Sequence, residues 1–133
     1  TRFRNVTGVQ TCALPILQSQ AESDLYLSVL SFGEIEKGIE KAVNKARKSK
    51  LKLWVGEDLK QRFKGRILAI DLDVCTKWGE IQAKTELLGK PMPAIDGLIA
   101  VSALVNNCIV VTRNTQDMMQ SGVDLFNPWK DEF

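Results

Sequence analysis

Two acidic residues occur in apolar surroundings, where a carboxylate is costly unless it has a function. Asp96 is the only charged residue between Lys90 and Arg113, in a segment that otherwise predicts a buried helix. Glu34 lies beside the apolar stripe of an earlier helix. Both also have a structural explanation. An acid in the first turn stabilises a helix by about 0.3–1 kcal/mol, and Glu34 could complete a capping box with Ser31.

Two further oxygen donors, Asn114 and Asp117, follow an apolar run that ends at Val111. If that run is a strand of a parallel sheet, they follow its carboxyl end, where the sites of such sheets are found. With Glu34 and Asp96 they form a set of hard oxygen ligands, which suits Mg²⁺ and Mn²⁺. Two such ions can activate a water and stabilise the leaving oxygen in phosphodiester cleavage. The set therefore indicates metal-dependent cleavage of a phosphodiester.

The composition excludes several other kinds of site. The chain has no histidine, which rules out Ser-His-Asp and Cys-His catalysis and every histidine-bound metal. Its three cysteines form no Cys-x-x-Cys pair, which argues against zinc and against a disulfide framework. A length of 133 residues with 44% apolar residues predicts one globular domain. No apolar run reaches the roughly 18 residues that span a membrane.

Short apolar runs alternate with helical patterns along the chain. Runs without polar alternation are typical of parallel strands that are buried on both faces by helices. We expect an α/β fold, a three-layer α/β/α sandwich with a mostly parallel central sheet. The first helix should start at Ser28 or Ser31 and continue through Val43 to Ala46, because apolar residues recur at helical spacing. The other expected elements are strands at 24–28, 67–70, 108–111 and 125–126, and helices at about 49–64, 73–88 and 93–106.

Basic residues are concentrated between Lys41 and Arg66, where only two acids accompany them. Four of the lysines would share one stripe of a helix. This stripe could be a solvated helix face, which is the commoner use of such a run, or a surface that binds the phosphates of a nucleic acid. The four lysines are Lys41, Lys45, Lys48 and Lys52.

The first residues differ in character from the rest. Residues 6–16 read VTGVQTCALPI, which is the translation of one reading frame of a common sequencing adapter. A secretory signal is the alternative, but polar residues and a proline interrupt the apolar stretch. We therefore expect residues 1–16 to be non-native and the domain to comprise residues 17–133. Residues 1–16 contain Arg2 and Arg4 and no acid, so they account for the net charge of +2.

Asp71 and Asp73 raise a different enzymatic hypothesis. Following the expected strand at 67–70, they resemble the Asp-x-Asp motif of haloacid-dehalogenase-type phosphatases, whose first Asp is the nucleophile and whose second is a general acid. The later lysine and paired acids of that family have no clear counterpart here. Asp73 could instead cap the next helix.

Five segments, YLSVLSFGEIEKGI, GRILAID, GKPMPAIDGLIA, CIVVTRNTQD and FNPW, resemble in order and spacing the PIN-domain ribonucleases. They are most similar to the VapC- and FitB-like toxins of type II toxin–antitoxin pairs, over about residues 25–129. This resemblance implies a cytoplasmic endoribonuclease that depends on Mg²⁺ or Mn²⁺ and does not associate with membranes. It also implies a homodimer that is inhibited when a cognate antitoxin inserts into the site.

The resemblance assigns roles to individual residues. Glu34 matches the helix acid of the family, and Asp96 matches the acid of its Ala-x-Asp motif. Asn114 occupies a position where relatives have Asp or Asn, and Asp117 could supply the charge that Asn114 lacks. These four are the expected catalytic residues, and the three acids among them are the expected metal ligands.

Other residues are expected to contact the substrate. Thr112 and Arg113 would lie near the metals or near the phosphate of the RNA. Lys41, Lys45 and Lys48 would bind phosphates farther along the strand.

One feature of the family, the acid of its first strand, has no counterpart in this sequence. The family opens with a strand that carries a further metal-binding acid, in a pattern such as Leu-Asp-Thr-Asn, but no Asp precedes Asp24. We therefore expect the first strand to be missing or non-native. The chain as written should then be impaired in catalysis and in stability, because loss of a central strand leaves backbone groups unpaired. A second hypothesis follows, that of an inactive PIN-like module which binds RNA or antitoxin without cutting.

Overall fold

The computed structural model describes residues 5–6, 24–128 and 130. Its strands are two residues long and all of their pairings are parallel. One group has the order β1-β4-β5 and the other pairs β2 with β3. Because β1 also lies beside β2, the strands follow one another in the order β3-β2-β1-β4-β5. They are β1 (Asn5–Val6), β2 (Leu27–Ser28), β3 (Ile67–Leu68), β4 (Val110–Val111) and β5 (Leu125–Phe126).

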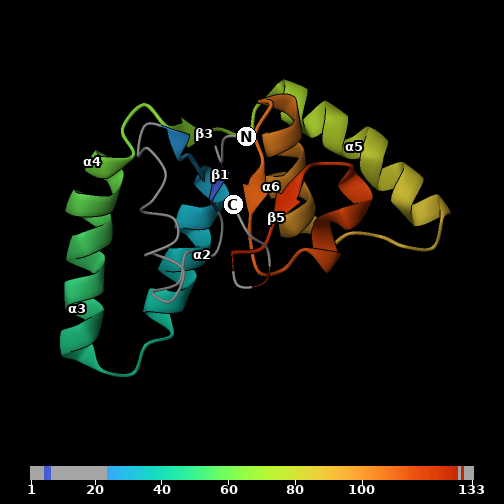
Figure 1. Cartoon of the computed structure of the whole chain (residues 1–133). Coiled ribbons are helices and arrows are strands. Elements are labelled where there is room, and N and C mark those ends of the chain that lie inside the picture. The colour runs from blue at the N-terminus through green and yellow to red at the C-terminus, as the bar shows by residue number, and fades with distance from the viewer. Residues whose placement is uncertain (1–4, 7–23, 129, 131–133) are drawn as a thin grey trace.

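Helices flank these strands on two sides (Figure 1). One side carries α2 (Val29–Glu40), α3 (Lys45–Leu53), a π-helical turn (Trp54–Leu59) and α4 (Lys60–Arg62). The other side carries α5 (Leu72–Leu87), α6 (Ala94–Val105) and a 3₁₀ helix (Gln116–Ser121). Within the described ranges, no helix is long and apolar enough to cross a membrane.

The two valines of β4 show why both faces of the sheet are covered. Successive residues of a strand point to opposite faces. Val111 belongs to a core with Ile39 of α2 and Val55 of the π-helical turn. Val110 belongs to a separate core with Ile99 of α6. The predicted three-layer α/β/α sandwich with its parallel sheet is thus confirmed.

Gly97 lets α6 pack closely against its surroundings. A Cβ atom at this position would lie 3.3 Å from Nε1 of Trp78 in α5 and 3.4 Å from Cε of Met92. Contacts at this distance are tight, so a larger residue requires its neighbours to move. Because Gly97 directly follows Asp96, such a movement would also displace the first turn of α6, which carries this acid.

The first helix of the pattern ends earlier than its apolar spacing predicts. α2 ends at Glu40, and Val43 is 97% exposed in the turn that follows. Asn44 then caps α3, because its Oδ1 accepts a hydrogen bond from the backbone N–H of Arg47 at 3.0 Å. The prediction of one helix to Ala46 was therefore wrong, and the second helix begins at Lys45, four residues before the expected start.

The structure has a strand in the place where we expected one to be missing or non-native. Asn5 and Val6 of β1 are in register with Val110 and Val111 of β4. Of the two alternatives, only a non-native strand therefore remains as a prediction. The rest of the adapter-like segment 1–16, and residues 17–23 after it, lie outside the described residues.

Candidate active site

Glu34 lies in the second turn of α2, where capping does not explain it. Ser28 caps this helix, because its Oγ accepts a hydrogen bond from the N–H of Leu30 at 3.1 Å. Ser31 is buried inside the helix, so the capping box of Ser31 and Glu34 is absent. The structural explanation that competed with a functional one for Glu34 was therefore wrong.

Asp96 lies in the first turn of α6, as predicted, and is partly buried. Asn114, in the loop that follows β4, donates a hydrogen bond from Nδ2 to Oδ2 of Asp96 at 3.2 Å. The helix dipole still accounts for an acid at this position. It does not account for the convergence of two polar side chains that are 18 residues apart in the chain.

The carboxylates influence one another across these elements. Partial desolvation, followed by the neighbouring Asp96 carboxylate, raises the pKa of Glu34, while Lys37 acts in the opposite direction. Burial and the nearby Asp117 carboxylate raise the pKa of Asp96. Asp96 is therefore the residue that the other three share, since Asn114 donates a hydrogen bond to it and Glu34 and Asp117 each interact with its charge.

Thr112 positions the loop that carries Asn114. Its side chain is buried, and its Oγ1 accepts a hydrogen bond from the N–H of Asn114 at 3.0 Å. Its own N–H donates to the carbonyl of Phe126 at 2.9 Å, which ties the loop to the end of β5. The Thr-x-Asn spacing is typical of such side-chain turns and could have indicated this role. Contact of Thr112 or of the exposed Arg113 with a substrate stays a prediction.

Two substitutions of Thr112 distinguish the contribution of its hydroxyl from that of its side-chain shape. We expect Thr112→Val to lower the free energy of unfolding by about 0.5–1.5 kcal/mol, because the N–H of Asn114 loses its acceptor. Thr112→Ser should retain most of that stability because it keeps the hydroxyl. Urea denaturation of both variants measures the difference, and equal losses in the two would contradict the turn.

The donor set suits a divalent cation that keeps most of its water. Among the described residues, no three His, Cys, Asp or Glu side chains are grouped closely enough to hold one metal ion. Mg²⁺ nevertheless needs only one or two carboxylates in addition to waters. Glu34 and Asp96 offer oxygen donors only, and their mutual repulsion is of the kind that a cation relieves.

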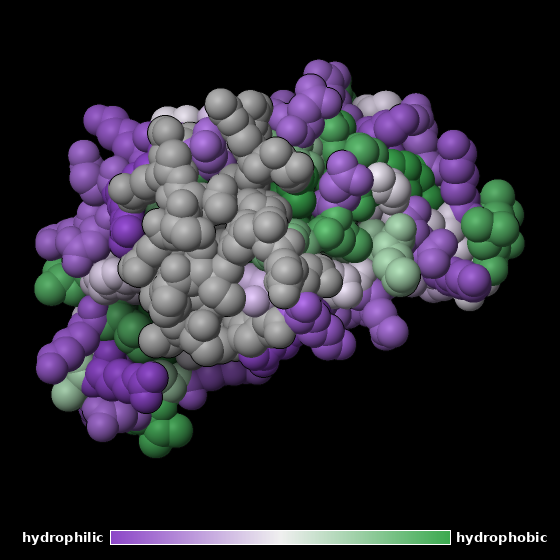
Figure 2. Space-filling view, in the orientation of Figure 1, coloured by the Kyte–Doolittle hydropathy of each residue, from purple (hydrophilic) through white to green (hydrophobic). Residues whose placement is uncertain are grey.

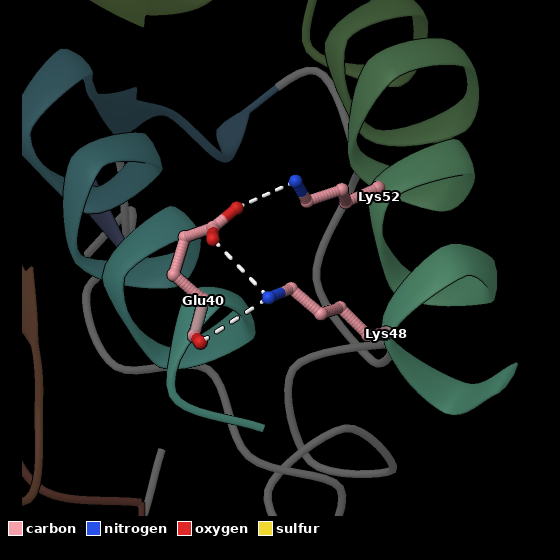
Figure 3. A network of polar contacts seen from close by, with 3 residues as sticks. All are labelled: Glu40, Lys48 and Lys52. Carbon is pink, nitrogen blue, oxygen red and sulfur yellow. Dashed lines mark hydrogen bonds and ion pairs between the residues drawn. The ribbon is translucent and has the colours of Figure 1, made fainter. Parts of the chain in front are cut away.

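The four lysines predicted to share one helical stripe are divided between two elements. Lys41 follows the last residue of α2, whereas Lys45, Lys48 and Lys52 belong to α3, so the prediction of one continuous stripe was wrong. Lys48 and Lys52 both bind Glu40 of α2 (Figure 3). Their Nζ atoms lie 3.2 Å and 2.5 Å from the two carboxylate oxygens of Glu40, and Lys48 also donates to its carbonyl at 3.4 Å.

Asp71 has a structural use that the phosphatase hypothesis did not consider. It caps α5, because its Oδ1 accepts a hydrogen bond from the N–H of Val74 at 3.0 Å. Asp73 lies in the first turn of the same helix, so Asp71 is the capping residue and Asp73 is not. Capping explains Asp71, and the helix dipole favours an acid at the position of Asp73.

Comparison with known proteins identifies the family of this chain. Residues 10–120 match the family model described as the PIN domain. The chain belongs to the PIN-domain family. Over 115 residues this PIN domain is 32% identical to the toxin FitB of Neisseria gonorrhoeae, which covers 86% of this chain and 83% of the relative. It is 27% identical over 114 residues to the VapC ribonuclease Y4jK of Sinorhizobium fredii, which covers 86% and 81%.

The fold of this PIN domain also matches a solved structure. The crystal structure of FitAcB from Neisseria gonorrhoeae superposes with a TM-score of 0.87 at 26% identity. The match covers 95% of this chain and 98% of that chain. The resemblance to VapC- and FitB-like toxins that the sequence motifs indicated is thereby confirmed.

Proposed function

We propose that this PIN domain is an endoribonuclease toxin of a toxin–antitoxin pair, which hydrolyses RNA phosphodiesters with Mg²⁺ or Mn²⁺. The observation that carries the proposal is the convergence of Glu34, Asp96, Asn114 and Asp117 from three separate segments. Similarity to relatives named as a toxin and as a VapC ribonuclease supports it.

Each residue of the site has a different proposed role. Asp96 and Glu34 would hold the cation, Asp117 would add negative charge beside Asp96, and Asn114 orients Asp96 by occupying its Oδ2. A bound cation would supply an activated water and would neutralise charge on the scissile phosphate and the leaving oxygen. Asn114 is then a positioning residue, which adds a hydrogen-bond donor where a fourth acid would add repulsion.

The surroundings of the site suit a protein partner, and we propose a cognate antitoxin as that partner. Each element that supplies an acid also exposes an apolar side chain, namely Val29 of α2, Ile95 of α6 and Met119 of the 3₁₀ helix. Exposed apolar side chains on these three elements would be covered by a bound protein. A homodimer remains a further part of the proposal, supported by the resemblance alone.

One observation favours the alternative of an inactive module that binds RNA or antitoxin without cutting. No Asp or Glu precedes Glu22 in the sequence, and β1 contributes only Asn5 and Val6 beside β4. The acid of the family's first strand therefore has no counterpart in β1. For this reason we propose that the chain as written is a weak enzyme.

A cleavage assay on long single-stranded RNA tests both proposals. We expect slow cleavage with Mg²⁺ or Mn²⁺, none in EDTA, and faster cleavage by a protein whose first strand has been restored from the parent gene. Cleavage that persists in EDTA would contradict the metal proposal. RNA that is bound by both proteins but cut by neither would identify the inactive module.

A further inference from the structure

α3 carries more positive charge than its ion pairs use. Five of its nine residues are basic and none is acidic. Lys48 and Lys52 are paired with Glu40 on the side that faces α2 (Figure 3). Arg47 and Lys50 are exposed, and within the described part of the chain neither side chain has a hydrogen bond or an ion pair. Neither Arg47 nor Lys50 belongs to the lysine stripe that the sequence indicated.

An exposed tryptophan lies next to these free charges. Trp54 begins the π-helical turn after α3 and is 43% exposed, whereas its neighbour Val55 is buried in the core. Arg47, Lys50 and Trp54 are spaced i, i+3 and i+7, which places them on one face of the helix. π-helical turns are rare and are frequent at functional sites.

The helix that carries these residues lies at an edge of the molecule. In Figure 1, α3 and α4 stand beside α2 and form one outer edge of the fold. The corresponding surface in Figure 2 is mostly hydrophilic, with isolated hydrophobic side chains. This outer edge is therefore accessible to a long polyanion.

We propose that Arg47, Lys50 and Trp54 form a second contact surface for single-stranded RNA, outside the carboxylate site. A base would stack on Trp54, while the two cations bind the flanking phosphates. Stacking on a side chain requires a base that is not already paired, which selects single strands. The choice of RNA as the ligand rests on the proposed function, and the absence of acids on α3 favours a polyanion.

The acidic site itself gives a reason for such a surface. Glu34, Asp96 and Asp117 repel the phosphates that the site must accept, so affinity for RNA has to come from elsewhere on the protein. A basic helix fastened to α2, the helix that carries Glu34, supplies that affinity without neutralising the carboxylates.

Binding of a fluorescein-labelled 20-nucleotide oligouridylate in EDTA tests the surface without cleavage. We expect Trp54→Ala to weaken binding about tenfold. The double variant Arg47→Ala, Lys50→Ala should weaken binding and lower the slope of log affinity against log salt by about 1.4. The matched control, Lys84→Ala with Lys90→Ala, removes the same charge near the end of α5 and should bind like the unaltered protein.

The outcomes that overturn the proposal are distinct. Failure of the unaltered protein to bind the oligonucleotide, equal binding by the α3 variants, or an equal loss in the control pair would each do so. Loss of antitoxin binding with RNA binding intact would assign the face to a protein partner and would also overturn it. If Trp54→Ala does not fold, the double variant carries the test, because both of its positions are exposed.

Failure of the proposed function gives a different pattern. If α3 is required for binding but no RNA is cut with Mg²⁺, the surface stands and the ribonuclease proposal fails. If a tetranucleotide is cut equally by all variants while the 20-nucleotide strand is cut more slowly by the α3 variants, both stand.

Discussion

Replacement of Asp96 by asparagine is expected to raise the melting temperature of the metal-free protein and to abolish its response to Mg²⁺. The metal-free protein holds Asp96 in surroundings that disfavour its charge, because burial and the Asp117 carboxylate raise the pKa of Asp96. Asparagine removes that charge. Its amide oxygen can still accept the hydrogen bond that Asn114 donates, so the fold loses a repulsion and keeps its contact.

With a divalent cation present, the unaltered protein should instead gain stability that Asp96→Asn does not gain. A ligand that binds only the folded state raises its stability, so Mg²⁺ should raise the melting temperature of the unaltered protein and leave Asp96→Asn unchanged. RNA cleavage should fall about 10²–10³-fold, as when one preorganised electrostatic group is removed. A site that is destabilising when empty and is needed when filled reflects the usual conflict between stability and activity.

Thermal melts with EDTA and with MgCl₂ measure both halves of this prediction. Asp124→Asn is the matched control, because it removes the same charge just before β5, at the opposite end of the strands. The control should show neither the rise in EDTA nor the loss of the Mg²⁺ response. An Asp96→Asn protein that Mg²⁺ still stabilises would show that Asp96 does not bind the metal.

Two isoleucines of α6 allow a similarly sharp test of the packing. Ile99 is 1% exposed and Ile95, one turn earlier, is 43% exposed. We expect Ile99→Ala to lower the free energy of unfolding by about 2–5 kcal/mol, because it leaves a cavity in the core that contains Val110. Ile95→Ala should cost much less, because a large part of that side chain already contacts water.

Urea denaturation of the two variants provides the measurement, and the unaltered protein provides the reference. The Ile99 loss is a large share of the about 5–15 kcal/mol that stabilises a typical domain, so this variant should unfold at a clearly lower urea concentration. Equal losses for the two variants would mean that α6 does not pack on the sheet through Ile99.

The sequence predicted the layers well because they depend on long-range regularities. Unalternating apolar runs such as the one that contains Val110 and Val111 require cover on both faces, and the structure has that cover. The boundaries of α2 and α3 were predicted poorly. Val43 continues the apolar repeat of α2, but the cap made by Asn44 depends on one hydrogen bond, which spacing does not reveal.

The residues of the site were predictable from the sequence, but their hydrogen bonds and ion pairs were not. The motifs identified Glu34, Asp96, Asn114 and Asp117, and the structure brings these residues together. The direction of the hydrogen bond from Asn114 was not predictable, because an amide can either donate to a neighbour or bind a metal. The same limit applied to the lysines, since partnership of Lys48 and Lys52 with Glu40 depends on how α3 folds back against α2.

The narrow space between Gly97 and Trp78 has a consequence for the evolution of the site. A side chain at position 97, next to Asp96, would enter the space that the Trp78 side chain fills. In relatives of this chain, a larger residue after the acid of the Ala-x-Asp motif should therefore coincide with a smaller residue at the position of Trp78. An alignment in which these two positions vary independently would show that the backbone of α6 shifts instead, and with it the acid that the helix presents.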